Sequence, residues 1–135
     1  MKKILFLLTL CCGVGFSAIA QKSPPTAVVA AFNKKFKDVK GVEWGKEKNG
    51  EWEAEFKNNG LEMSANFSAD GKWLETETEI KFAELPAAVQ AALKGKKVGE
   101  AAKIVRADGT TVYEAEVHQD LIFDASGKLQ PQSKE

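Results

Sequence analysis

The chain contains the same segments twice, and this repetition limits its possible folds more than any other feature. The segment WEAEF at 52–56 returns 61 positions later as YEAEV at 113–117. At the same offset, PTAVVAAF at 25–32 returns as PAAVQAAL at 86–93. Matches that share one offset over such a distance are typical of a duplicated unit, because each copy folds into one supersecondary structure. We therefore expect a tandem repeat.

A third match shows where the two copies differ in length. FSADGKW at 67–73 returns as FDASGKL at 123–129, an offset of 56, so the second copy has lost about five residues between its middle strands. We expect one domain over residues 21–135, made of repeats at about 23–82 and 83–131 and a short polar tail. Each half alone, of about 50 to 60 residues, would have only a marginal core. The halves are therefore expected to fold together.

The first twenty residues have the pattern of a secretory signal peptide. Lys2-Lys3 precedes an apolar run, and Ala18-Ile19-Ala20 is a small-x-small cleavage pattern. A membrane anchor is one alternative, but glycine and serine interrupt the run, whereas a spanning helix needs about 20 apolar residues. A lipoprotein acylated at Cys11 or Cys12 is another, disfavoured because Thr9 and Leu10, and not a pair of small residues, precede Cys11. We expect residues 1–20 to be removed and the protein to be periplasmic or secreted, without a membrane span.

Cleavage would also limit the chemistry that the chain can carry. Both cysteines lie in the first twenty residues, so the mature chain would have no thiol for catalysis, disulfides or soft metals. The segment holds two of the 19 basic residues and none of the 19 acidic ones, which leaves a net charge of −2. This slightly acidic balance disfavours nucleic acid as a partner.

Each copy is expected to begin with a helix that has one apolar stripe. The first helix follows Ser23-Pro24-Pro25, where proline suits a helix start. The second opens at Leu85-Pro86 and is expected to end at Lys94-Gly95. The stripes are Val28, Phe32 and Phe36 in the first helix and Val89 and Leu93 in the second.

After each helix the apolar period changes from about four residues to two, which predicts half-buried antiparallel strands. The strands are expected at 42–44, 51–56, 61–67 and from 72 onward, then at 103–106, 111–118, 120–123 and 128–130. Turns such as Asn58-Asn59-Gly60 separate them, because Asn and Gly tolerate positive φ. Each copy is then αββββ. A striped helix and a one-sided sheet must cover each other, so we expect an α+β fold with helices packed on one face of an antiparallel sheet.

The last strand of the first copy has two possible registers. If Asp70-Gly71 is a two-residue turn, Phe67 pairs with Leu74 and Trp73 points to solvent. If 69–71 is a three-residue loop with a glycine bulge, Phe67 pairs with Trp73, which then faces the core. The duplication favours the second register, because the counterpart of Trp73 is a leucine. The three glutamates that follow then require a bulge or an exposed strand end.

The combined pattern resembles a known family. A helix opens with Leu-Pro at 85–86 and is followed by strands, and in both copies Phe-x-Ala-x-Gly-Lys precedes the last strand. This pattern is similar to the PepSY-like, β-lactamase-inhibitor-like periplasmic proteins of Bacteroidetes-type bacteria. Gly41-Val42-Glu43-Trp44 and the repeated Glu-Ala-Glu also fit. The resemblance implies helices on an antiparallel sheet, a location outside the cytoplasm, and a non-catalytic binding or inhibitory role. It supplies no catalytic residues, and the first copy departs from it with Ser23-Pro24-Pro25.

The candidate binding surface is the polar face of the sheet. Its expected members are Glu53, Glu55, Glu62, Glu114, Glu116 and His118. Such carboxylates would give a negative field that speeds encounter with a basic partner, although plain solubility is the alternative. Two-residue spacing also puts the last three in one row, a weak cation site at most, because transition-metal sites use several His or Cys ligands. We expect no catalytic residue, no dedicated metal site and no cofactor.

The favoured function is therefore non-catalytic binding of another extracytoplasmic protein. One form of such binding is inhibition of a hydrolase, either a protease or a β-lactamase-like enzyme. A small-ligand or cation-binding module, using a concavity where the halves meet, is the first alternative. An envelope structural or assembly component is the second. An inhibitor would form a saturable complex, whereas a cation module would gain thermal stability on adding one metal.

Overall fold

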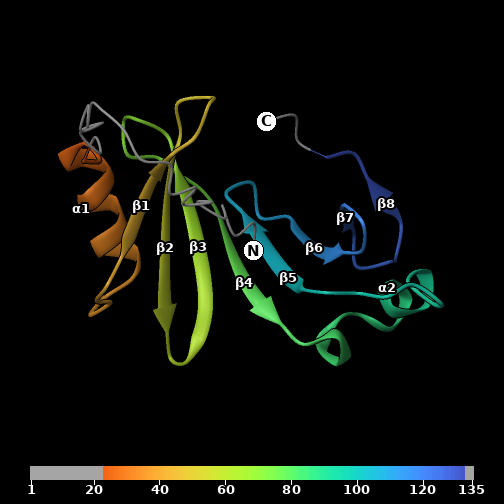
Figure 1. Ribbon diagram of the computed structural model, residues 1–135. Coiled ribbons are helices and arrows are strands. Elements are labelled where there is room, and N and C mark those ends of the chain that lie inside the picture. The colour runs from red at the N-terminus through yellow and green to blue at the C-terminus, as the bar shows by residue number, and fades with distance from the viewer. Residues whose placement is uncertain (1–22, 133–135) are drawn as a thin grey trace, which may run out of the picture.

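The computed structural model describes residues 23–132, which form two α-helices, one short 3₁₀ helix and eight strands (Figure 1). The order along the chain is one helix and four strands, then the 3₁₀ helix, a second helix and four more strands. The predicted signal peptide, residues 1–20, lies outside the described residues. Within the described part, no helix has the length and apolar character needed to cross a membrane.

All eight strands form one antiparallel sheet in which each strand pairs with the next along the chain. The strands are β1 Glu43–Lys46, β2 Trp52–Asn58, β3 Leu61–Phe67, β4 Trp73–Ile80, β5 Ala101–Arg106, β6 Thr111–Glu116, β7 Asp120–Phe123 and β8 Leu129–Gln130. The sheet is curved, and the two helices lie near its opposite ends (Figure 1). Six residue pairs join β4 to β5, from Glu75 with Arg106 to Ile80 with Ala101, so the sheet is continuous between the two halves of the chain.

The observed strands agree with the predicted ones in number and order, and differ at some ends. β3 and β7 have the predicted bounds, whereas β5 begins two residues earlier. β6 ends at Glu116 and not at His118, because Glu116 pairs with Asp120 and the chain has to reverse in the three residues between them. The prediction that His118 extends the row of Glu114 and Glu116 is therefore wrong. His118 is exposed in the turn.

Both α-helices begin directly after a proline. α1 spans Thr26–Lys35 after Pro25, and α2 spans Ala87–Ala92 after Pro86. Proline suits the start of a helix because a backbone N–H there has no acceptor within the helix. α2 is shorter than predicted: Leu93 already has a non-helical ψ of 3°, and the chain turns away at Gly95, whose φ is +80°. The 3₁₀ helix η1, Phe82–Glu84, precedes α2.

Each α-helix contributes to its own buried cluster. Val28 and Phe32 of α1 pack with residues of β2 and β3, and the Phe32 ring centroid lies 5.0 Å from that of Phe56 in an edge-on contact. The members of the first cluster are Val28, Phe32, Trp52, Ala54, Phe56, Ala65 and Phe67. The second cluster, around Val89 of α2, consists of Leu85, Val89, Leu93, Ala101, Ala115 and Phe123.

The register of Trp73 is the predicted one. Phe67 pairs with Trp73, and residues 69–71 form a three-residue loop closed by a hydrogen bond from the Ser68 N–H to the Lys72 carbonyl (2.9 Å). The half-buried Trp73 packs against the first cluster, and its ring lies beneath the Lys35 ammonium, 3.5 Å from the centroid. A bulge next to Phe67 then returns Glu75 to the face opposite Trp73, as the sequence required.

Candidate binding face

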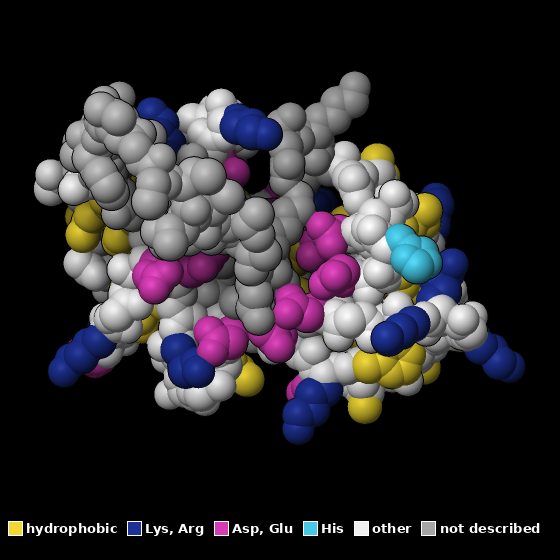
Figure 2. All heavy atoms as spheres, viewed as in Figure 1, with side chains coloured by type: hydrophobic (Ala, Val, Ile, Leu, Met, Phe, Trp, Pro, Cys, Tyr) yellow, Lys and Arg dark blue, Asp and Glu magenta, His cyan; other side chains and the backbone are white. Residues whose placement is uncertain are grey.

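Carboxylates from several strands lie on one face of the sheet. Successive residues of a strand point to opposite faces, and residues paired across strands share a face. Glu55 pairs with Glu43 and Ser64, and Ser64 pairs in turn with Glu77. We call this surface the acidic face. Its carboxylates are Glu43, Glu53, Glu55, Glu62, Glu75, Glu77, Glu79, Glu114, Glu116 and Asp120. Figure 2 shows acidic side chains gathered across the middle of the molecule.

Five of the six predicted site residues lie on this face, in two groups. Glu53, Glu55 and Glu62 belong to the adjacent strands β2 and β3. Glu114 and Glu116 belong to β6, three strands from β3, a separation of about 14 Å at the usual strand spacing. His118 lies in the turn after β6. A partner that contacts both groups would therefore have to extend across most of the sheet.

Glu53 has the most perturbed carboxyl of the face. Burial of the group, followed by the negative charges of Glu55 and Glu47, raises its pKa to about 7, although a hydrogen bond with Ser64 opposes the shift. Burial disfavours the charged form of a carboxyl, and so does a neighbouring negative charge. Glu53 therefore holds its proton more tightly than an isolated glutamate.

Two further carboxyls of the face are shifted in the same direction. Burial and then the charges of Glu43 and Glu47 raise the pKa of Glu55. Burial likewise raises the pKa of Glu77, with smaller contributions from the charges of Glu75 and Asp120. Adding a positive charge close to these groups would favour their ionised form. The face therefore has an electrostatic preference for cationic groups.

Within the described part of the chain, basic side chains form ion pairs with Glu62 and Glu75 of the face. The Lys57 ammonium lies 2.6 Å from Oε1 of Glu62, and Nε of Arg106 lies 3.4 Å from Oε2 of Glu75. The first pair is exposed and the second half-buried, and exposed pairs contribute little to stability. Within residues 23–132, no group of three or more His, Cys, Asp or Glu side chains converges in a way that would hold a metal ion.

The acidic face also carries an apolar cluster that the sequence analysis missed. Ile104, Val112 and Ile122 are buried together, and their pairing with Glu77 and Glu114 places them on this face. The alternation of apolar and polar residues predicted that one face of every strand is polar. The signal that could have found the cluster is the apolar run LIF at 121–123, because continuous apolar runs are typical of strands covered on both faces.

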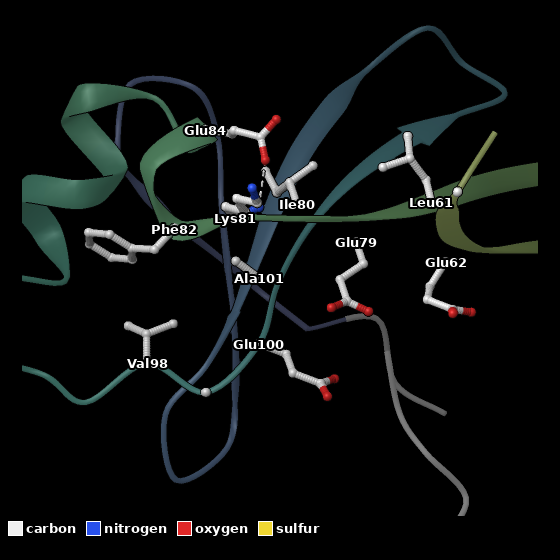
Figure 3. A pocket seen from close by; sticks show the side chains of 12 residues that line it. Leu61, Glu62, Glu79, Ile80, Lys81, Phe82, Glu84, Val98, Glu100 and Ala101 are labelled. Carbon is white, nitrogen blue, oxygen red and sulfur yellow. Dashed lines mark hydrogen bonds between the residues drawn. The ribbon is translucent and has the colours of Figure 1, made fainter. Parts of the chain in front are cut away.

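An open pocket of about 440 Å³ lies where the two halves of the chain meet (Figure 3). Its walls come from the β2–β3 hairpin, the end of β4 with η1, and the segment that leads into β5. Leu61, Phe82 and Val98 are apolar lining residues, and the carboxylates of Glu62, Glu79 and Glu100 lie on one side (Figure 3). The sequence suggested a concavity between the halves without its lining, and of these residues it named only Glu62, as part of the polar face.

Solved structures of low sequence identity share this fold. A protein from Bacteroides eggerthii, described as one of its "putative periplasmic proteins", is 20% identical, with 83% of this chain and 89% of that chain covered and a TM-score of 0.74. A DUF2874 family protein from Bacteroides ovatus is 22% identical, with 82% and 86% covered and a TM-score of 0.72. A BLIP-like protein from Bacteroides fragilis is 24% identical, with 84% and 88% covered and a TM-score of 0.69.

A protein-family model gives the classification of the chain itself. No curated protein matches the sequence. The family model described as "Putative beta-lactamase-inhibitor-like, PepSY-like" matches residues 50–131. This stretch is more than half of the chain and contains every strand from β2 to β8 together with α2. The eight-stranded antiparallel sheet with its few helices is also the fold of the BLIP-like protein. The chain therefore belongs to the putative beta-lactamase-inhibitor-like, PepSY-like family.

Proposed function

We propose that this chain is a non-catalytic, extracytoplasmic binding module that captures another protein through its acidic face. The observation that carries the proposal is the alignment of carboxylates from several strands on one face, three of them with raised pKa values. Ionising these groups next to one another is unfavourable until a cation approaches, so a basic partner would gain from binding there. Inhibition of an extracytoplasmic hydrolase is the form of binding that the family description favours.

The proposal includes a duplicated architecture, with repeats at about 23–82 and 83–131 that each lay a helix on the same face of the sheet. Two equivalent contacts support it. A Cβ on Gly71 would lie 2.6 Å from the Ala27 carbonyl oxygen, and a Cβ on Gly127 would lie 2.5 Å from that of Ala88. The offsets are those of the sequence repeats. Helices on that face would leave the acidic face to a partner.

Delivery to the periplasm is the second element of the proposal. Removal of residues 1–20 would free a chain that starts at Gln21 and contains all described elements. The description of the Bacteroides eggerthii structure as periplasmic supports this location. A basic protein or a basic loop of a protein in that compartment is then the expected partner.

A capture experiment with matched variants tests the acidic face. The chain from Gln21 is used as bait in periplasmic extract of the source organism, beside a variant with Glu53, Glu55, Glu114 and Glu116 changed to Gln. The control removes the same number of charges in turns, by changing Asp38, Asp70, Asp108 and Asp124 to Asn, which keeps a side-chain oxygen for the turn hydrogen bonds. Circular dichroism establishes that all three baits are folded.

The expected result is one partner retained by the wild type and the turn variant, lost by the Gln variant, and released as salt is raised. Equal retention by all three baits would assign binding to another surface and would refute the use of the acidic face. A bait that retains no protein and instead fractionates with envelope assemblies would favour the structural role over capture of a soluble target.

A further inference from the structure

The pocket between the halves combines an apolar wall with a charged one. Leu61 and Phe82 are 49% and 42% exposed, and they are two of the three large apolar side chains that are exposed in the described part of the chain. Both line this pocket, together with Val98. Exposed apolar side chains that gather at one site mark a binding surface more often than scattered ones do.

The charge of the pocket is strongly unbalanced. Among the described residues, four carboxylates and one ammonium, that of Lys81, line it, and the Lys57 ammonium outside the lining pairs with one of the four, Glu62. One of the four, Glu84, accepts a hydrogen bond from the Lys81 backbone N–H (2.7 Å) and so helps to cap η1. The other three, those of Glu62, Glu79 and Glu100, lie on the side of the pocket away from Phe82 (Figure 3). A ligand that fits must therefore present a cation on one side and an apolar group on the other.

We propose that this pocket binds a protein segment in which a lysine or arginine is adjacent to an apolar side chain. The apolar side chain lies against Phe82 and Val98, and the cation lies beside the carboxylates of Glu79 and Glu100 (Figure 3). Burying an apolar anchor in a pocket beside paired charges is how a few residues supply most of the energy of a protein complex. The inference rests on the proposed function only in choosing a protein segment as the ligand.

The position of the pocket fits this occupant. Glu62 and Glu79 belong both to the pocket and to the acidic face, so a partner on that face reaches the pocket without leaving the surface. A volume of about 440 Å³ accommodates one or two side chains and not a folded element. The pocket therefore acts as an anchor site at the edge of a larger interface.

Short peptides test the pocket directly. The chain from Gln21, labelled with ¹⁵N, is titrated with acetyl-Leu-Lys-Leu-amide, and the amide shifts of Gly60, Leu61, Gly99 and Ala101 report binding. Acetyl-Leu-Gln-Leu-amide lacks the cation, and acetyl-Gly-Lys-Gly-amide lacks the apolar groups. We expect saturable shifts at these four amides, with an affinity for the first peptide about three- to ten-fold higher than for either control.

Variants separate the two walls of the pocket. Glu79→Gln should weaken binding of the lysine peptide about three-fold without affecting the glutamine peptide. Phe82→Ser should weaken both leucine-containing peptides about five-fold. Leu129→Ser removes the third exposed apolar side chain, outside the pocket, and should change nothing.

Equal affinities for the three peptides, or shifts that avoid the four amides, would overturn the inference. The residues changed in the capture experiment do not line the pocket. Peptide binding without a captured partner would therefore support the pocket as a binding site and refute the proposed function. A captured partner without peptide binding would refute only the pocket.

Discussion

At the scale of single residues, Glu53 makes the stability of the protein depend on pH. Its pKa is raised from 4.5 to about 7, mainly by burial and by its acidic neighbours. Between these two values the folded state binds more protons than the unfolded state, so this group stabilises the fold fully below about pH 4.5 and loses that effect as the pH rises through about 7.

We therefore expect the free energy of unfolding to fall between about pH 5 and about pH 8, and to fall less in Glu53→Gln, by about 1 to 3 kcal/mol at about 1.4 kcal/mol per pKa unit. Urea denaturation followed by tryptophan fluorescence measures the difference. Glu116→Gln, which removes an exposed carboxylate of the same face, is the control and should leave the slope unchanged. An equal slope in wild type and Glu53→Gln would show that Glu53 titrates normally.

At the scale of elements, two hairpin loops pack against the first turns of the two helices. The loop between β3 and β4 meets α1 at Gly71, and the loop between β7 and β8 meets α2 at Gly127. Both glycines have a positive φ, and in both an added Cβ would overlap a helix carbonyl. Gly109, in the β5–β6 turn, has the same φ of +87° as Gly71 but no atom within 4 Å of its Cβ position.

Alanine at Gly109 should therefore cost only the left-handed conformation, about 1 to 2 kcal/mol. Gly71→Ala and Gly127→Ala should each cost at least about 1 kcal/mol more, because the loop has to move away from its helix. Midpoints of urea unfolding give the three values. If the three variants lost equal stability, the two loops would not pack against the helices at Gly71 and Gly127.

The same elements show what the sequence could predict. The alternation in 61–67 located β3, and Asn59-Gly60 located its hairpin, because both residues must adopt positive φ, which they do at +50° and +80°. Local pattern and turn chemistry were sufficient there. They failed for His118, whose strand ends earlier to leave room for a turn, and for Ile104, which breaks the expected polar face. The pocket combines three separate segments, and no local pattern predicts how such segments meet.

At the scale of the whole molecule, the six residue pairs between β4 and β5 make the two halves depend on each other. Without β5, the strand β4 would present an unpaired edge, and each half would retain only seven to nine residues in buried clusters. The halves should therefore unfold in one transition.

The aromatic residues provide a test. All three tryptophans lie in the first half, so tryptophan fluorescence reports on that half alone. Phe123→Ala empties a site in the second cluster and should lower the fluorescence midpoint as well, by the equivalent of about 3 kcal/mol. Phe56→Ala, in the first cluster, gives the reference effect. A fluorescence midpoint unaffected by Phe123→Ala would mean that the halves unfold independently.

The order of the strands also has a kinetic consequence. Each strand pairs with the one made just before it, and the largest separation between paired residues is the 31 positions from Glu75 to Arg106. Pairing between successive strands keeps the connecting loops short, which lowers the entropy lost on closing them and speeds folding. A chain that emerges from its N-terminus, from a ribosome or through a translocation pore, finds the partner of each new strand already in place. Assembly can therefore keep pace with emergence.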